Sequence, residues 1–598
     1  MILLSLNLIL SFLLMGTDLP DGESSGMARV TKDRQPPNVI LIITDDQGYG
    51  DLGFHQNPFI KTPVIDQLAS ESINFRNFYV SPVCAPTRAS LMTGRYSIRT
   101  GVFDTYSGGA IMASEETTIA EVFRDAGYTT GLFGKWHLGD NYPSRPQDQG
   151  FTTTVWHQAG GIGQVGDIFN YYKKDSSYFD PVLWKNGKKY QSKGYCSDVF
   201  TDETIQFIQE NREKPFFAYL SFNAPHTPLQ LPQSYYDMYR QEEINPDYFR
   251  ERDQYTHDML DRDVEAARKV YGMVTNIDDN LGRLIAVLKK EKLYKNTIIV
   301  FMTDNGPQQH RYTGGFRGRK SSVREGGIHA PFYIKPVASM SAKKEIKTAA
   351  AHLDVLPTLA SLCSIKLDNS LKLDGKNLAP YLTKKSGDAP SSPLFFEWQR
   401  SYPEKYRNMA VIKNGYKLVA NTGMDSPLDQ FELYHLAEDP YEANNLAGQH
   451  PEIATDLRKE IDGWYEDIMK SPHINRLPRI IIGSAHENPV LLNRNDARGM
   501  QLIWNQPDIH VSWDVSVASA GHYKVSCFFT EEIDKSGDLI FRIGNKNFTL
   551  ENKKKGTRKL VFDSIYLDEG DFTIDGWYLY HQRPFITPFY IELEKLGT

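Results

Sequence analysis

The chain has 598 residues and a formal net charge of −7, with 40% hydrophobic, 24% charged and 12% aromatic residues. The length predicts two to four domains, since one domain contains roughly 150 residues, and the composition excludes a disordered, collagenous or polytopic membrane protein. The negative charge argues against a nucleic-acid partner bound through its phosphates, and four cysteines are too few for a disulfide scaffold.

An apolar run, MILLSLNLILSFLLM, forms residues 1–15 and is followed by small and polar residues. It is shorter than the roughly 20 residues that span a bilayer, so we predict a signal peptide over residues 1–22. The run lacks a preceding Lys or Arg, and a buried N-terminal helix or strand is the alternative. No later segment is apolar and long enough to span a membrane, so we expect a periplasmic or secreted protein.

Residues 36–385 alternate short apolar runs with amphipathic runs, a pattern typical of a mostly parallel sheet covered by helices. We therefore predict an α/β domain. The predicted strands are residues 39–44, 129–134, 216–222, 297–303 and 331–335. The predicted helices are residues 62–72, 117–126, 202–210 and about 264–290, the last with an apolar side chain at every third or fourth position.

The pattern changes after residue 385. Residues 386–485 predict a small antiparallel subdomain with strands at 394–398, 409–412, 416–420 and 432–436 and one helix at 451–469. Residues 490–598 have almost no helical periodicity and predict a separate β-sandwich. Its predicted strands are 501–504, 510–517, 522–529, 539–543, 546–550, 559–565, 571–579 and 589–593.

Two predicted strands end in similar polar pairs. NVILIIT is followed by Asp45 and Asp46, and NTIIVFMT is followed by Asp304 and Asn305. Ligands bind outside the carboxyl ends of strands in open α/β sheets, so these side chains can surround one point. Three carboxylates and an amide suit a hard cation, Ca²⁺ or Mg²⁺, rather than zinc. Each pair alone is equally consistent with a turn or a helix N-cap.

A cysteine lies in the proline-bounded turn SPVCAPTR. Cys84 precedes Arg88 by four residues at the entry to a predicted helix. This arrangement places a small reactive side chain beside a fixed cation and free backbone N–H groups, which can hold an anion. A lone buried cysteine is otherwise usually a small apolar side chain.

The sequence C-x-P-x-R at residues 84–88, followed by ASLMTGR, resembles the signature of the type I sulfatases, arylsulfatase-like members of the alkaline-phosphatase superfamily in which this cysteine is oxidised to formylglycine. Further family motifs occur in order: NVILIITDDQGYGDLG at 38–53, GKWHLG at 134–139, NAPHTP at 223–228, TDNG at 303–306, GRKSSVREGG at 318–327, and LYHL to NLA at 433–447. The resemblance covers about residues 36–470. It implies the alkaline-phosphatase-like α/β fold with a small C-terminal antiparallel subdomain.

The resemblance also implies roles for individual residues. The metal ligands would be Asp45, Asp46, Asp304, Asn305 and the formylglycine at Cys84, with Ca²⁺ the family's usual ion. The remaining sulfate-site positions are matched by Arg88, Lys135, His137, His226 and Lys320. Taken alone, the two lysines are typical of a surface and the two histidines of a core or a loop. We expect Arg95 and Arg99 to pair with carboxylates near Cys84, and Arg317, Arg319 and Arg324 to form a solvated basic face.

Cleavage of a sulfate ester at sulfur needs a nucleophile, charge neutralisation and a proton for the departing alcohol. A hydrated aldehyde at position 84 has two hydroxyls, one to attack sulfur and one whose deprotonation expels sulfate. The resemblance assigns this deprotonation to His137. His226 is the predicted acid, with Lys320 on the same bridging oxygen, while Arg88 and Lys135 stabilise equatorial charge.

The expected substrate is a sulfated glycan, attacked from its end at sulfated galactose or N-acetylgalactosamine, and a formylglycine-generating maturation enzyme is the expected partner. We predict a substrate wall from residues 155–164 and the aromatic stretches 169–172 and 178–180, with His157 as a further substrate contact. The aromatic residues of the sandwich, including Trp504, Trp513, Trp577 and His581, indicate a structural brace or oligomer contact, or else carbohydrate binding. The alternatives for the whole chain are a phosphodiesterase or phosphonate monoester hydrolase of the same superfamily and a non-catalytic glycan-binding protein.

Overall fold

The computed structural model describes residues 35–252, 254–384, 387–424, 426–499, 508–580 and 585–597. The predicted signal peptide, the predicted strand 501–504, Trp504 and His581 lie outside the described residues. Within the described ranges, no helix is both apolar enough and long enough to cross a bilayer.

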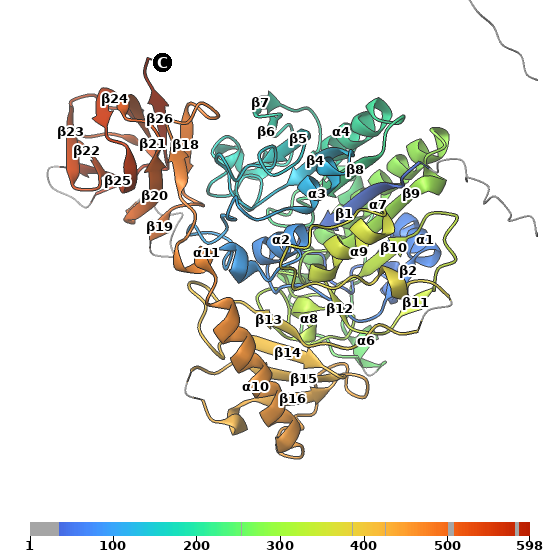
Figure 1. Cartoon of the computed structure of the whole chain (residues 1–598). Helices are drawn as coiled ribbons and strands as arrows, with labels where there is room; N and C mark the ends of the chain where they lie inside the picture. Colours follow the sequence, from blue (N-terminus) through green and yellow to red (C-terminus); the bar gives the residue numbers. More distant parts are fainter. Residues whose placement is uncertain are drawn as a thin grey trace, which may run out of the picture. The chain divides into compact units, whose positions relative to one another are not determined.

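A ten-stranded sheet forms the centre of the fold (Figure 1), in the order β11-β2-β10-β9-β1-β8-β4-β5-β6-β7. Its five central strands are parallel: β9 (Thr297–Thr303), β1 (Asn38–Thr44), β8 (Phe216–Ser221), β4 (Thr129–Lys135) and β5 (Thr153–His157). The flanking strands are β10 (Phe332–Lys335), which is antiparallel to β9, and β2 (Ile73–Phe75), β11 (Glu345–Ile346), β6 (Val182–Lys185) and β7 (Lys188–Gln191). The prediction of a mostly parallel sheet is confirmed; β5 was not predicted, because its sequence TTVWH is short and half polar.

Helices cover both faces of this sheet. Val39, Leu41 and Ile43 of β1 share one core with the first group of helices, whereas Ile40 and Ile42 share the opposite core with the second group. The first group is α2 (Cys84–Thr93), α3 (Ile119–Asp125) and α9 (Val355–Leu362), and the second is α1 (Pro63–Glu71), α4 (Cys196–Glu210) and α7 (Asp261–Lys290). A strand buried on both faces is apolar at every position, which is why β1 was recognisable from its sequence.

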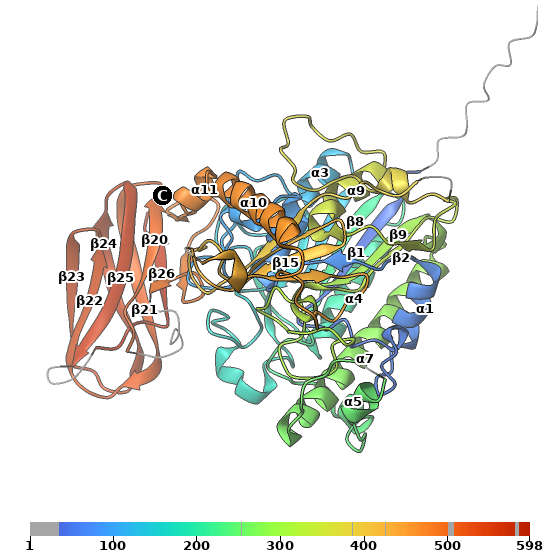
Figure 2. The ribbon, with the colours of Figure 1, turned by 90° about the horizontal axis from the view of Figure 1, so that it is seen from below.

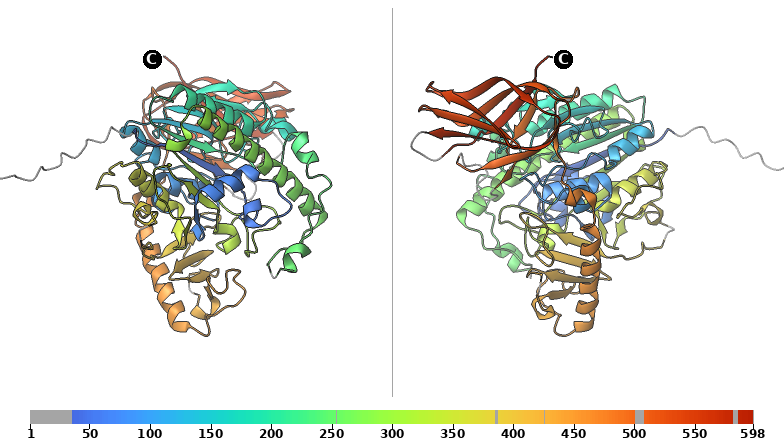
Figure 3. Two further views of the ribbon diagram at one scale, coloured as in Figure 1. Left: turned by 90° about the vertical axis from the view of Figure 1, so that its right-hand side faces the viewer. Right: turned by 60° about the vertical axis from the view of Figure 1, so that its left-hand side comes forward.

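A four-stranded antiparallel sheet follows, formed by β13 (Leu394–Glu397), β14 (Met409–Lys413), β15 (Tyr416–Ala420) and β16 (Glu432–His435). The helix α10 (Pro451–Ile468) lies along it, as the orange helix in Figure 3 shows. Its apolar side chains Leu457, Ile461 and Trp464 pack on the sheet. These elements lie where the sequence predicted them.

Two further sheets form the C-terminal sandwich, whose strands lie side by side in Figure 2. One sheet contains β17 (Ile480–Ile482), β19 (Arg498–Gly499), β20 (Val511–Val517), β25 (Gly570–Tyr580), β22 (Gly537–Ile543) and β23 (Lys546–Asn552). The other contains β18 (Val490–Asn493), β26 (Tyr590–Lys595), β21 (Gly521–Ile533) and β24 (Thr557–Leu567). The sandwich begins before the predicted residue 490. Ile480 and Ile482 of β17 pair with β20, and their side chains belong to the core of the sandwich.

Candidate active site

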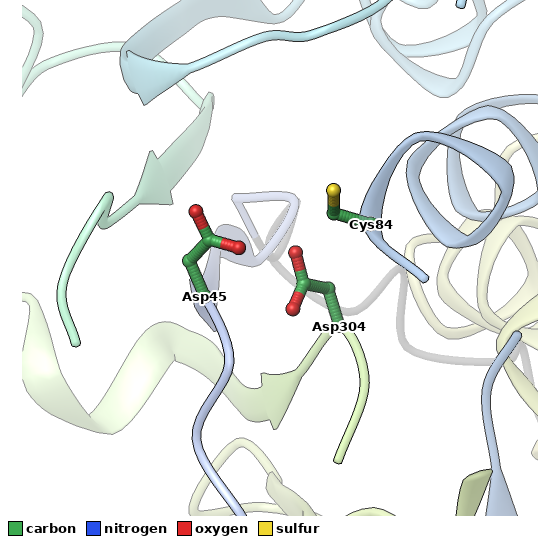
Figure 4. Close-up of side chains that lie close together, drawn as sticks. All are labelled: Asp45, Cys84 and Asp304. Atoms are coloured by element: carbon green, nitrogen blue, oxygen red, sulfur yellow. The ribbon is translucent and has the colours of Figure 1, made fainter. Parts of the chain in front are cut away.

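Two neighbouring parallel strands bring four oxygen-bearing side chains to one point. Thr44 of β1 is in register with Thr303 of β9, so the polar pairs that follow lie next to each other. The backbone N–H of Asp46 donates to Asp304 Oδ1 (3.2 Å), and Asn305 Nδ2 donates to Asp46 Oδ1 (2.8 Å). In Figure 4 the carboxylates of Asp45 and Asp304 and the thiol of Cys84 approach a common space. One ligand atom from each of these three residues lies within 4.8 Å of the others.

The donor set fits a hard cation. Asp45 Oδ1 and Asn305 Oδ1 are buried and have no hydrogen-bond partner in the described part of the chain. A buried oxygen without a partner is unfavourable, and a divalent cation would satisfy both atoms. Oxygen ligands from carboxylates and an amide are those that Ca²⁺ and Mg²⁺ prefer.

Basic side chains surround these acids. Lys135 Nζ lies 2.7 Å from Asp45 Oδ2, and Lys320 Nζ lies 2.7 Å from Asp46 Oδ1. Arg88 donates through Nε (3.1 Å) and Nη2 (2.8 Å) to Asp304 Oδ2. The structure therefore brings together the predicted metal ligands and the predicted basic residues.

The basic groups do not neutralise the acids completely. Burial acts to raise the pKa of Asp46, but the charge of Lys320 lowers it below its ordinary value. Burial and the charge of Asp45 instead raise the pKa of Asp304 to about 7. The cluster of acids thus retains a tendency to hold a proton, which a divalent cation would replace.

Cys84 is the first residue of α2, and the N-cap residue Val83 makes no side-chain capping hydrogen bond in the part of the chain that the structure describes. The first N–H groups of an α-helix have no partner inside the helix and favour negative charge nearby. Arg88 follows one turn later, so it lies on the same face of α2 as Cys84. Burial raises the pKa of the Cys84 thiol, and Sγ lies 3.4 Å from His137 Nδ1.

The orientation of His137 is fixed by two contacts. Its Nε2 lies 2.7 Å from the carbonyl oxygen of Thr105; because a carbonyl only accepts, Nε2 carries the proton and Nδ1 faces Cys84 with a free lone pair. A Cβ at Gly160 would lie 2.7 Å from the ring, so only glycine permits this close approach. Burial and the charge of Lys135 lower the pKa of His137 well below its ordinary value, which keeps Nδ1 unprotonated.

His226 is held by the same kind of contact. Its Nδ1 donates to the carbonyl oxygen of Thr227 (2.7 Å), and its Nε2 lies 3.6 Å from Asp46 Oδ2. Burial lowers the pKa of His226 to about 3, although the charge of Asp46 acts in the opposite direction. Nε2 therefore carries no proton before an additional negative charge arrives.

Comparison with known proteins assigns the family. The profile of the Sulfatase family matches residues 37–365, and that of the N-sulphoglucosamine sulphohydrolase C-terminal region matches residues 316–493. The chain belongs to the sulfatase family. It is therefore an enzyme acting on sulfated substrates, in a family that generally uses a metal ion and formylglycine.

Relatives and solved structures agree with this assignment. Human arylsulfatase A (Homo sapiens) is 31% identical over 485 residues, which cover 71% of this sulfatase and 87% of that protein. N-acetylgalactosamine-6-sulfatase of Mus musculus is 28% identical over 391 residues, covering 60% and 69%. The crystal structure of Ps i-CgsB in complex with k-i-k-neocarrahexaose has 28% identity and a TM-score of 0.61, and covers 73% of this chain and 94% of that one.

A cavity of about 570 Å³ opens above the site of this sulfatase. Cys84, His137, His226 and Lys320 line it, whereas Lys135 is completely buried and does not line it. Several lining residues were not predicted: Thr105, Tyr106, His257, Gln308, Arg400 and Asn495. They come from loops without a recognisable motif. Arg319, expected on a solvated face, also lines the cavity.

Several expected side chains lie elsewhere. His157 is fully buried beside Lys135, with its Nδ1 2.9 Å from the carbonyl oxygen of Gln158, and it does not line the cavity. The predicted substrate contact therefore finds no support in this position. Arg95 and Arg99 do pair with carboxylates, as expected: Arg95 with Glu116 and Arg99 with Asp374. Arg317 and Arg324, expected on a solvated face, instead bind the carbonyl oxygen of Glu442 and the carboxylate of Glu432.

The aromatic stretch 169–172 contacts the sandwich instead of the cavity. The ring of Tyr171 lies 4.7 Å from that of Phe589, and the Tyr172 hydroxyl donates to the carbonyl oxygen of Phe529 (3.4 Å). Of the predicted wall, Gly160 and Gln164 do line the cavity. Aromatic side chains serve sugar binding and domain packing equally well, so composition could not separate the two roles.

The sandwich itself reaches the cavity. Asn495, in the loop after β18, lines the cavity, and its carbonyl oxygen accepts from the backbone N–H of Gly108 (3.2 Å). Trp513, one of the aromatic residues considered for carbohydrate binding, is fully buried and donates through Nε1 to the carbonyl oxygen of Asn493 (2.6 Å). These contacts favour a structural role for the sandwich.

Proposed function

We propose that this sulfatase removes sulfate from a sulfated carbohydrate, acting from the glycan end on galactose or N-acetylgalactosamine. The proposal rests on one observation: Cys84 lies at the helix N-terminus, facing an unprotonated His137 nitrogen and buried oxygens without partners, on the wall of a polar cavity. The likeness to N-acetylgalactosamine-6-sulfatase of Mus musculus supports the choice of sugar.

We further propose that a maturation enzyme oxidises Cys84 to formylglycine and that Asp45, Asp46, Asp304 and Asn305 hold Ca²⁺, with Mg²⁺ as the alternative. When bound, the cation would withdraw charge from the sulfate and favour deprotonation of the hydrated aldehyde. The orphaned oxygens of Asp45 and Asn305 support this ligand set.

The residues around position 84 then have distinct tasks. His137 Nδ1 accepts a proton from the side chain at position 84, because its Nε2 is already committed to Thr105. Lys320 places its positive charge at the cavity wall, on the bridging oxygen of the ester. Arg88 uses Nε and both Nη atoms on protein acceptors, so its task is to position Asp304. Lys135 does the same for Asp45.

His226 supplies the proton for the departing alcohol. A sulfate ester in the cavity brings negative charge beside the ring and raises the pKa of His226 from its low value. Nε2 is the only ring nitrogen that can then gain a proton, since Nδ1 already donates to Thr227. The proton is thus acquired together with the substrate.

Substitution of Cys84 tests the proposal. We expect Cys84→Ala to keep the fold and to lose more than about 10³-fold in kcat, as removal of a nucleophile does. Mass spectrometry of the peptide containing residue 84 should find formylglycine in active protein. An unmodified thiol in active protein, or faster hydrolysis of aryl phosphates or phosphonates than of aryl sulfates, would contradict the proposal.

We also propose that residues 1–22 direct the protein to the periplasm or outside the cell. N-terminal sequencing of the protein purified from its host should begin after this segment. Recovery of the intact N-terminus from the cytoplasm would contradict export.

A further inference from the structure

The wall of the active-site cavity is strongly cationic, although the whole chain has a net charge of −7. Arg319, Lys320 and Arg400 line the cavity, and among the described residues no Asp or Glu does. Lys320 is paired with Asp46 in the sulfate site. Arg400 is paired with Asp104, whereas Arg319 forms no ion pair with a described carboxylate, so the positive charge of Arg319 is in excess of what one sulfate group requires.

Arg400 is held rigidly with one edge unused. Its Nη1 donates to Asp104 Oδ1 (2.6 Å) and to Thr105 Oγ1 (3.0 Å), and its guanidinium carbon lies 4.1 Å from the ring centre of Tyr106. Its Nε and Nη2 have no acceptor in the described part of the chain. The side chain is 33% exposed. A planar guanidinium fixed by stacking, with two parallel N–H groups free, is the arrangement that binds an oxyanion through two hydrogen bonds.

Arg319 has a similar arrangement. Its Nη1 donates to the carbonyl oxygen of Gln308, and its remaining N–H groups have no acceptor among the described residues. His257, which also lines the cavity, has a buried Nε2 with no hydrogen-bond partner among the described residues. Unused donors on a cavity wall are unfavourable unless a ligand or water accepts from them.

We propose that the cavity contains a second anion subsite, formed by Arg400 and Arg319, and that the preferred substrate has a second anionic substituent, a sulfate or a carboxylate, beside the sulfate that is removed. This inference rests on the proposed function, because it assumes that the scissile sulfate binds at Cys84. Arg400 and Arg319 are then specificity-determining residues, and Asp104 is a positioning residue that acts through Arg400.

The test compares matched substrates. Rates are measured for galactose 6-sulfate and N-acetylgalactosamine 6-sulfate, for the same sugars with a second sulfate, and for disaccharides in which a uronic acid supplies the carboxylate. We expect wild-type kcat/KM to be about tenfold to a hundredfold higher for the substrates with the second anion, the range for hydrogen bonds to charged groups. The preference ratio is kcat/KM for a substrate with the second anion divided by kcat/KM for the same sugar without it. Whichever anion, sulfate or carboxylate, gives the larger ratio identifies the natural substituent.

Variants then locate the subsite. Arg400→Gln and Arg319→Gln should each lower this ratio severalfold, with Arg400→Lys intermediate, because lysine keeps the charge but not the paired donors. Arg407→Gln is the matched control: Arg407 is 58% exposed, binds Glu404 and does not line the cavity, so its ratio should equal that of wild type. A purely structural role for Arg400 would lower both rates equally and leave the ratio unchanged.

Failure of this inference is distinguishable from failure of the proposed function. Equal wild-type rates with and without the second anion, or variants that keep the wild-type ratio, would overturn the second subsite alone. If none of the sugars is cleaved although an aryl sulfate is, the proposed sugar is wrong. Inhibition of aryl sulfate hydrolysis by mono- and disulfated sugars then decides on the subsite: equal inhibition by the two would overturn it.

Discussion

Buried carboxylates gather in two regions of this sulfatase with different surroundings. In the active site, Asp45, Asp46 and Asp304 each lie beside a lysine or arginine. Where the sandwich meets the central domain, Asp140 and Asp496 are also buried, but among the described residues no basic side chain forms an ion pair with either. Asp140 Oδ2 accepts from Asn493 Nδ2 (2.8 Å) and from the backbone N–H of Ala159 (2.8 Å).

The pKa of Asp46 is shifted in the opposite direction to those of Asp140 and Asp496, whereas the pKa of Asp304 is raised as theirs are. Burial raises the pKa of Asp496 to about 6, and burial together with Asp496 raises that of Asp140 well above its ordinary value. For Asp46, the charge of Lys320 outweighs burial, and the pKa falls. The comparison teaches that burial alone makes a carboxyl group retain its proton. We infer that cationic neighbours and convergent ligand atoms distinguish the region that binds a cation.

Bound metal should distinguish the two carboxylate regions most clearly. We expect Asp45→Ala to lose bound Ca²⁺ and at least about 10³-fold in kcat, because the sulfate loses the charge that stabilises it during reaction. Asp496→Asn should keep the metal and the activity. Atomic emission spectroscopy of the purified proteins, with sulfate release as the rate assay, measures both.

Two results would contradict this expectation. Retention of the metal in Asp45→Ala would show that the ion binds elsewhere. Loss of metal in Asp496→Asn would show that the Asp140 and Asp496 pair, rather than the predicted ligand set, holds the cation.

The pH dependence of stability distinguishes the regions next. Asp496 has a folded-state pKa of about 6, above the unfolded value of about 3.9. The raised pKa means that ionisation disfavours the folded state, so stability falls as the pH rises from about 4 to about 6 and then levels off. The full difference is up to about 3 kcal/mol.

Asn cannot ionise, so Asp496→Asn should remove most of this fall. We therefore compare the Tm difference, variant minus wild type, at two pH values. We expect this difference to be a few degrees larger at pH 7.5 than at pH 4.5, as measured by calorimetry. A Tm difference between variant and wild type that is the same at both pH values would mean that Asp496 does not carry a raised pKa.

Much of the acidic region was predictable from sequence. Asp45 and Asp304 follow strands that are buried on both faces and therefore apolar throughout. The ends of such parallel strands meet at one edge of the sheet, so the pattern already implied that these acids meet. Cys84 and Arg88 were predictable together, because their spacing of four residues places them on one helix face.

The rest of the cavity was not predictable in the same way. Arg400 follows β13, and Asn495 follows β18 in the sandwich, so only the tertiary fold brings them to the cavity. His157 was misplaced for a related reason: β5 was not predicted, and its register beside Lys135 buries the ring.

The smallest expected effect is the loss of stability when the aromatic contact between the sandwich and the central domain is removed. Two tyrosine-to-alanine variants, at Tyr172 and Tyr106, test it. Tyr172 is 43% exposed and lies against Phe589, with ring centres 5.9 Å apart, whereas Tyr106 lines the cavity and stacks on Arg400. We expect Tyr172→Ala to lower stability by about 1 kcal/mol, the value of one aromatic pair, with KM unchanged. Tyr106→Ala should instead raise KM, because Arg400 loses one of the two rings that it stacks on, Tyr106 and Trp398. A higher KM in Tyr172→Ala would support the prediction that residues 169–172 bind the sugar. An unchanged KM in both variants would show that Tyr106 does not contribute to substrate binding.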